Sequence, residues 1–260
     1  MNLCVDVGNS TIAIGIYAEN KLVKRLTFTT DLVKTVDEYQ NIIYQQVAIK
    51  KIDATKIKNI IFSSVVPTLN NPLKKALTSI FTEASLLCIN PGIKTGLALR
   101  VDNPNEIGND LIADLVGGKE RYGYPLIICD LGTASKILVL DNKGYFTTAL
   151  IMPGLEASIK TLSSGTALLP EISLEKPKTV LAKNTVEAMN AGTIYGHADM
   201  VIGLADRIEK ELGYSCKRVI TGGNAIPMLD IVKDAYIYDE NLNLDGLNLI
   251  IQKNGGNYHE

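Results

Sequence analysis

The sequence predicts an α/β protein with two domains of related topology, each with a mixed β-sheet, and a cleft between them. The chain has 260 residues, which is enough for two domains of ordinary size. In each half, β-rich apolar runs come first and helical segments then alternate with further strands. An apolar run that ends in Asp-x-Gly occurs at Asp6 and returns at Asp130, 124 residues later, which indicates a duplicated design.

The first domain, residues 1–112, is predicted to open with three antiparallel strands. Short polar turns separate three β-branched runs, which is typical of a meander, over residues 2–7, 11–18 and 21–29. Thr35 and Glu38 form a capping box, which predicts a helix to about Lys51. A strand, a helix that begins at Asn71-Pro72 and another strand then follow, over residues 58–65, 71–81 and 85–89. A helix from about Glu106 to Arg121 connects the two domains.

The second domain, residues 113–260, is predicted to repeat this plan. Its strands are expected over residues 126–133, 137–140, 145–151, 217–221 and 235–238. Its helices are expected over residues 153–164, 185–212 and 223–233. The stretch from Asp239 to Asp245 reads as a loop that leads into a last strand or helix.

Charge and hydropathy argue against nucleic-acid and membrane partners and favour a small-molecule ligand. The formal net charge is −2, and a nucleic-acid groove or a polybasic membrane patch would require a cationic excess. No apolar stretch approaches the roughly 20 residues that span a bilayer. The start of the chain lacks a signal-peptide pattern, and the four cysteines read as small buried residues. We therefore expect a cytoplasmic protein with no nucleic-acid or membrane partner.

The duplicated Asp-x-Gly tips suggest phosphate chemistry. Glycine lets the backbone turn tightly and approach a ligand, the following amides and hydroxyls donate hydrogen bonds, and the aspartate attracts a cation. A single Asp-x-Gly is also ordinary hairpin chemistry, so it is the second copy that favours a site for a polyphosphate. The paired glycines at Gly222-Gly223 read equally as a nucleotide contact or as a plain β-α turn.

Eight motifs then occur in the order found in type III pantothenate kinases, which the chain resembles over essentially its whole length. They are Asp6-Val7-Gly8-Asn9-Ser10, Ser63-Ser64-Val65-Val66-Pro67, Asn103-Pro104 with Gly108-Asn109-Asp110, Asp130-Leu131-Gly132-Thr133-Ala134, Met152-Pro153-Gly154, Leu168-Leu169-Pro170, Asn184-Thr185 and Thr221-Gly222-Gly223. That family belongs to the acetate and sugar kinase, heat-shock protein 70 and actin superfamily, so the resemblance implies two ribonuclease-H-like, actin-like domains.

The resemblance also implies an activity and its cofactors. The expected reaction is ATP-dependent phosphorylation of pantothenate to 4'-phosphopantothenate, the first step of coenzyme A synthesis. The expected cofactors are ATP, Mg²⁺ and a monovalent cation, K⁺ or NH₄⁺. A homodimer with active sites at its interface is the expected assembly.

The resemblance also implies a role for individual residues, at the positions where this sequence matches the motifs of the family. The resemblance assigns ATP binding to Asp6, Val7, Gly8, Asn9, Ser10, Thr11, Ile12, Ala13 and Thr133. It assigns the monovalent cation to Asp130 and the general base to Asp110, which also lies where the helix dipole favours an ionised acid. Substrate contacts map to Val101, Gly108, Asn109, Asp110, Leu111 and Thr185, the last of these serving the neighbouring subunit. Asp114 lies on the same helix face as Asp110, which allows a carboxylate pair, and a solvated acid is the favoured expectation.

The substrate side departs from the family pattern. Leu111 stands where the family has Arg, Val101 stands where it has Tyr, and Lys136 stands where a further Thr is usual. Leucine cannot reproduce the bidentate pairing of Arg with a carboxylate. Three hypotheses therefore stay open: a divergent pantothenate kinase in which Lys94, Arg100 or the second subunit holds the substrate carboxylate, a kinase of another hydroxyl metabolite, and a non-catalytic nucleotide-binding regulator.

Overall fold

The computed structural model describes residues 1–255 and divides the chain into two compact units. The first unit comprises Met1–Leu97, Asp102–Gly117 and the chain from Asn241 onward, and the second comprises Ala98–Val101 and Gly118–Glu240. This division differs from the single expected boundary at 112/113, because the last helix packs on the sheet of the first unit.

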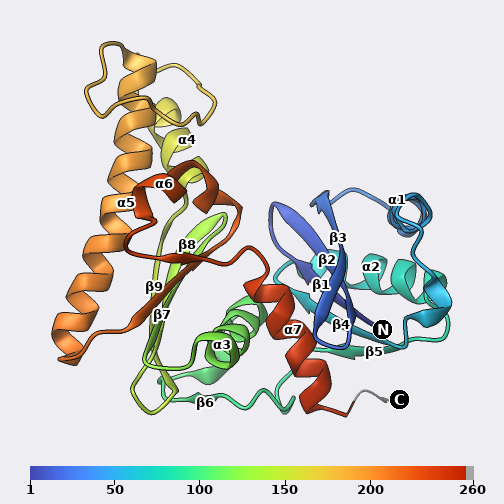
Figure 1. Ribbon diagram of the computed structural model, residues 1–260. Helices are drawn as coiled ribbons and strands as arrows, with labels where there is room; N and C mark the ends of the chain where they lie inside the picture. Colours follow the sequence, from blue (N-terminus) through green and yellow to red (C-terminus); the bar gives the residue numbers. More distant parts are fainter. Residues whose placement is uncertain (256–260) are drawn as a thin grey trace. The chain divides into compact units, whose positions relative to one another are not determined.

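The first unit contains a five-stranded mixed sheet in the order β3-β2-β1-β4-β5 (Figure 1). The strands are β1 (Asn2–Val7), β2 (Thr11–Ala18), β3 (Lys21–Thr29), β4 (Asn59–Ser64) and β5 (Ser85–Cys88). The first three form the predicted antiparallel meander, and β4 and β5 add in parallel. Alternate residues of β1 point to opposite faces of the sheet, so Val5 and Asp6 face different layers.

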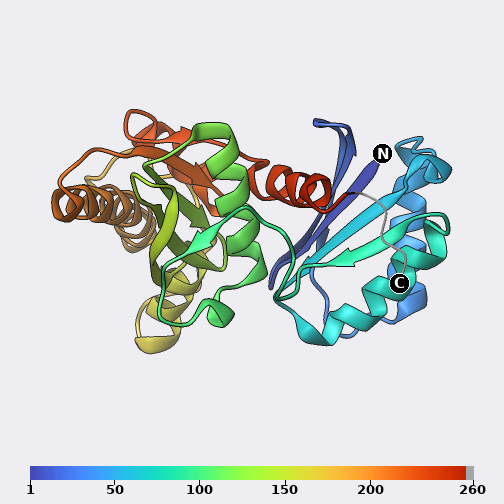
Figure 2. The ribbon, with the colours of Figure 1, turned by 90° about the horizontal axis from the view of Figure 1, so that it is seen from below.

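Helices cover both faces of this sheet (Figure 2). Helices α1 (Val36–Ile49) and α2 (Pro67–Ile80) pack over the Val5 face, and α7 (Leu242–Lys253) packs over the opposite face with the first turns of α3 (Asn109–Tyr122). Thr35 and Glu38 form the predicted capping box. Helix α2 begins earlier than expected, because Pro67 takes the N-terminal position and Pro72 is accommodated inside the helix.

The sheet of the second unit repeats the strand arrangement of the first sheet. Its order is β11-β10-β7-β8-β9-β6, in which β9-β8-β7-β10-β11 has the same neighbours and directions as β3-β2-β1-β4-β5. The strands are β6 (Ala98–Leu99), β7 (Leu126–Leu131), β8 (Ala134–Leu140), β9 (Tyr145–Pro153), β10 (Lys217–Thr221) and β11 (Ile237–Tyr238). The predicted duplication is therefore confirmed, with β6 as an unpredicted edge strand.

Helices α4 (Leu155–Gly165) and α5 (Thr185–Leu212) lie on one face of the second sheet (Figure 1). The helix expected over 223–233 is instead a 3-10 turn over Gly223–Met228 followed by the short α6 (Leu229–Val232). Pro227 explains this difference, because it has no N–H for a continuous α-helical ladder. Short 3-10 turns also occur at Ala54–Lys56 and Pro104–Glu106.

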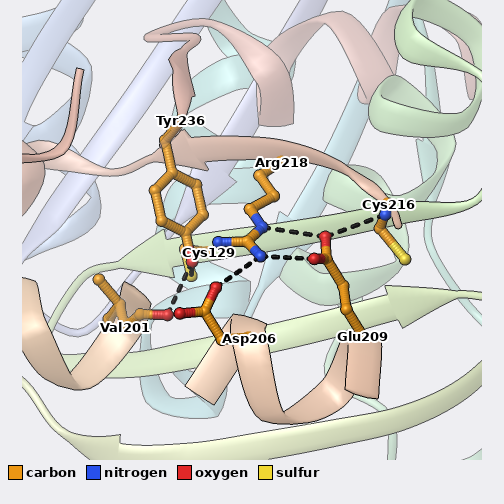
Figure 3. A network of polar contacts seen from close by, with 7 residues as sticks. All are labelled: Cys129, Val201, Asp206, Glu209, Cys216, Arg218 and Tyr236. Atoms are coloured by element: carbon orange, nitrogen blue, oxygen red, sulfur yellow. Dashed lines mark hydrogen bonds and ion pairs between the residues drawn. The ribbon is translucent and has the colours of Figure 1, made fainter. Parts of the chain in front are cut away.

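A polar network fastens α5 to the second sheet (Figure 3). Arg218 on β10 donates to Glu209 (Nη2–Oε2 2.6 Å) and to Asp206 (Nη2–Oδ1 2.7 Å) on α5. The hydrogen bond from Arg218 lowers the pKa of the Glu209 carboxyl. Tyr236, just before β11, donates from Oη to the backbone carbonyl of Val201 on α5 (2.8 Å). Burial raises the pKa of the neighbouring Cys129 thiol to about 12. This thiol therefore stays protonated at neutral pH.

Within residues 1–255, the helices are all too short or too polar to cross a membrane.

Candidate active site

The first hairpin, β1–β2, presents a rigid polar tip. Gly8 N–H donates to Thr11 O (2.9 Å), and Thr30 on the chain after β3 donates from Oγ1 to Gly8 O (2.7 Å). At the base of the tip, Ser63 on β4 donates from Oγ to Asp6 Oδ1 (3.0 Å). Ser63 is buried, so this bond fixes the orientation of the Asp6 carboxylate.

Of the eight residues expected to bind ATP here, Asp6, Gly8 and Ala13 are partly exposed, and the other five are either exposed or buried. Asn9, Ser10 and Thr11 are exposed at the turn, where their amides and hydroxyls can reach a ligand. Val7 and Ile12 are buried in the core, so a contact from these two residues would come from the backbone alone.

The second hairpin, β7–β8, has a shorter turn, which a hydrogen bond from Asn224 stabilises. Gly132 N–H donates to Ala134 O (3.2 Å), and Asn224 Nδ2 donates to Gly132 O (2.8 Å). Thr133 is exposed at the tip, as a ligand contact requires. Asn224 follows the paired glycines, so this β-α junction holds the hairpin in place.

Two glycines allow other chain segments to pack directly against this hairpin. A Cβ on Gly154 would lie 2.5 Å from the carbonyl oxygens of both Gly132 and Thr133. Gly222 has φ +91° and ψ 152°, a conformation that only glycine adopts readily, and a Cβ there would overlap the backbone of Leu131. Both motif glycines therefore have a packing role that sequence reasoning did not assign.

We expect Gly222→Ala to destabilise the protein by about 3 kcal/mol, because backbone strain adds to overlap with Leu131. The displaced hairpin should lower the midpoint of urea unfolding and raise the Kd for MgATP. Gly223→Ala is the matched control, since its Cβ would meet nothing within 4 Å. Equal midpoints for the two variants would contradict the packing role.

Asp130 lies directly across the hairpin from Lys136, and the two side chains form an ion pair (Nζ–Oδ2 2.8 Å). Both are partly buried, with 15% of the Asp130 side chain and 18% of the Lys136 side chain exposed. The position expected to hold a monovalent cation thus already carries a positive charge from the chain.

Asp110 lies in the first turn of α3 and is partly exposed. Its carboxylate folds back over Gly108, where a Cβ would overlap it. From α7, Asn243 Nδ2 donates to the backbone carbonyl of Asp110 (3.0 Å) and to Asp114 Oδ1 (3.1 Å). Asp114 is only 1% exposed, so the expectation of a solvated acid is wrong: it is a buried group that joins the two helices.

The remaining substrate-side residues are distributed over both units. Leu111 is buried with 8% of its surface exposed, whereas Asn109 is partly exposed beside it. Val101 belongs to the second unit, next to Arg100, whose guanidinium stacks on the Tyr145 ring at 3.8 Å. Thr185 is exposed in the first turn of α5, after the Asn184 cap.

Metal-binding capacity is limited in the described part of the chain. Among residues 1–255, no group of three or more His, Cys, Asp or Glu side chains could hold a metal ion. Mg²⁺ is commonly bound by one or two carboxylates together with phosphate oxygens, and the Asp6 carboxylate has the chemistry for such a shared site.

Three supporting residues were not among the predicted site residues. Ser63 belongs to a quoted motif, but its bond to Asp6 depends on the parallel pairing of β1 with β4. Asn224 follows the paired glycines, and Asn243 comes from a helix far away in sequence. Lys136 was noted in the sequence only because it replaces a Thr of the family pattern.

The chain matches a known protein family over most of its length. The family profile described as type III pantothenate kinase matches residues 2–207. A type III pantothenate kinase of Citrifermentans bemidjiense is 39% identical over 98% of this chain and 100% of the relative, and one of an Exiguobacterium species is 36% identical over 98% and 99%. A solved Sinorhizobium meliloti structure, assigned as a 2-dehydro-3-deoxygalactonokinase, superposes with a TM-score of 0.60 at 11% identity, over 100% of this chain and 99% of that one, which shows the shared fold alone. The chain belongs to the type III pantothenate kinase family.

Proposed function

We propose that the protein transfers the γ-phosphoryl group of ATP to pantothenate, giving ADP and 4'-phosphopantothenate for coenzyme A synthesis. The observation that carries this proposal is the family match, which extends over residues 2–207 and so includes both hairpins and the start of α3. A kinase requires ATP and a divalent metal ion, because phosphoryl transfer depends on positioning and on neutralising phosphate charge.

In the proposed reaction, each hairpin is a phosphate-binding element of its own unit. Residues 6–13 and Thr133 supply backbone amides and hydroxyls, which suit phosphate oxygens. Asp6, oriented by Ser63, is placed to meet the ion that accompanies the nucleotide. When bound, Mg²⁺ offsets the charge on the phosphate oxygens.

Asp110 is the proposed general base for the acceptor hydroxyl. Asp110 lies in the first turn of α3, and the hydrogen bond from Asn243 Nδ2 to its backbone carbonyl holds that turn in place. A carboxylate there can orient the hydroxyl and accept its proton late in the transfer. Gly108, Asn109 and Leu111 are proposed to line the acceptor site beside Asp110, and the resemblance implies a further substrate contact at Val101.

We also propose a homodimer in which Thr185 serves the neighbouring subunit. Exposed apolar side chains occur on α4, at the start of α5 and on the chain between these helices, and they support an interface at this end of α5. These side chains are Leu162, Leu168, Val180, Leu181 and Val186. A cytoplasmic location is part of the same proposal, and it is consistent with the four cysteines, which are all free thiols.

The resemblance further implies a monovalent cation, K⁺ or NH₄⁺, at Asp130. The carboxylate has the chemistry to bind one, since hard cations prefer oxygen ligands. The Lys136 ammonium forms an ion pair with the same carboxylate.

A second candidate function is a kinase for a different hydroxyl compound. Only the residues expected to contact the acceptor favour it. Leu111 and Val101 lack the Arg and Tyr side chains of the family pattern, and Leu111 is buried. An acceptor without a carboxylate would have no need of an arginine fork.

An assay of ADP release with MgATP tests both functions. The expected result is ADP release that depends on pantothenate. Mass spectrometry should then show a product about 80 Da heavier than the substrate, the mass of one added phosphoryl group. Light scattering on the same sample is expected to give the mass of a dimer. Turnover with another hydroxyl compound only would favour the second function, and MgATP binding without turnover would favour a regulator.

A further inference from the structure

The two hairpins offer an internal comparison, because each aspartate occupies the same place in its sheet. Asp6 pairs with Ala13 across the first hairpin, whereas Asp130 pairs with Lys136 across the second. Residues directly opposite each other on neighbouring strands project from the same face. Only the second aspartate therefore faces a cationic partner from its own hairpin.

The register of β7 and β8 fixes this ion pair. Leu131 pairs with Ser135 and Cys129 with Ile137, and both flanking pairs are fully buried on the opposite face. A slip of one residue would move those apolar side chains out of the core, so Lys136 is held opposite Asp130. The 2.8 Å separation is that of a charge-assisted hydrogen bond.

This arrangement does not fit a monovalent metal cation on Asp130. The carboxylate bears one negative charge, and the Lys136 ammonium already lies against it in a partly buried position. A second cation beside the same oxygens would be repelled by the ammonium, and the repulsion is stronger where water is partly excluded. The expected cation ligand is therefore already neutralised by the chain itself.

We propose that the Lys136 ammonium takes the place of the monovalent cation, so that the protein binds nucleotide without K⁺ or NH₄⁺. A lysine ammonium carries the same single charge and can donate up to three hydrogen bonds. Because it is covalently attached and fixed by the strand register, its presence does not depend on the salt in solution. This inference rests on the proposed nucleotide site but not on the identity of the acceptor.

The test measures the Kd for MgATP by calorimetry in a buffer free of K⁺, Na⁺ and NH₄⁺, with tetramethylammonium chloride keeping the ionic strength constant. For the wild-type protein, replacing tetramethylammonium by K⁺ is expected to change Kd by less than about twofold. Lys136→Met should bind at least about tenfold more weakly without K⁺, since a charge-assisted hydrogen bond is lost, and K⁺ or NH₄⁺ should restore much of the affinity.

Lys143→Met is the matched control, because Lys143 is exposed in the turn between β8 and β9. It should behave as wild type in both salts. A wild-type Kd that tightens about tenfold on adding K⁺ would overturn the inference, as would Lys136→Met binding as tightly as wild type without K⁺. The wild-type measurement alone decides the matter if Lys136→Met does not fold.

Failure of the proposed function has a different signature. Binding of MgATP that is independent of K⁺, together with no phosphorylation of pantothenate, would reject the acceptor and leave the role of Lys136 intact. Pantothenate turnover that requires K⁺ would support the function and reject the role of Lys136.

Discussion

Asp110→Asn is expected to lower kcat by about 10²- to 10⁴-fold, the usual contribution of a general base. Asparagine has nearly the size of aspartate and keeps one oxygen acceptor, but it cannot take up the proton of the acceptor hydroxyl. The hydrogen bond from Asn243 goes to the backbone of Asp110, so the substitution leaves that contact in place. Steady-state kinetics measure the loss, and an unchanged Kd for MgATP would confine it to the transfer step.

Asp114→Asn separates this role from that of the neighbouring carboxylate. Asp114 is buried and bonded to Asn243, so its variant is expected to lose thermal stability more than turnover. Glu106→Gln changes an exposed carboxylate before the helix and should behave as wild type. If Asp110→Asn turned over normally while Asp114→Asn did not, the general base would be Asp114.

Gly246→Ala is expected to destabilise the first unit by about 3 kcal/mol. Helix α7 crosses α3 so closely that a Cβ on Gly246 would overlap the carbonyl group of Ala113, and a Cβ on Gly117 would overlap Leu242 O. Because the obstacles are backbone atoms, they cannot rotate away, and the two helices must separate. Asn243 would then move away from Asp110, so kcat should fall together with the urea midpoint.

Gly203→Ala provides the control, because Gly203 is also in a helix interior but its Cβ would meet nothing within 4 Å. That substitution should be neutral or stabilising by up to about 1 kcal/mol, since alanine favours the helix. Equal stabilities of the Gly246→Ala and Gly203→Ala variants would show that the crossing of α3 and α7 tolerates a methyl group.

Most individual elements could be predicted from local sequence. The meander strands, the capping box at Thr35 and the long helix α5 all follow from short-range patterns, and the structure has them at or near the expected bounds. Some errors lie at prolines: Pro67 and not Pro72 stands at the start of α2, and Pro227 interrupts the helix expected over residues 223–233. Another is β6, which is too short to leave a periodic pattern.

By itself, the sequence determined the duplication, the two Asp-x-Gly tips and the order of motifs, because these depend on residue type and spacing along the chain. Only the tertiary structure decided which residues support those tips. Ser63 reaches Asp6 through parallel strand pairing, α7 returns from the chain end to hold the turn of Asp110, and Lys136 faces Asp130 through cross-strand register. The first two contacts join segments far apart in the sequence, whose approach is set by packing of the whole unit, and the third depends on a strand register that the buried face of the hairpin fixes.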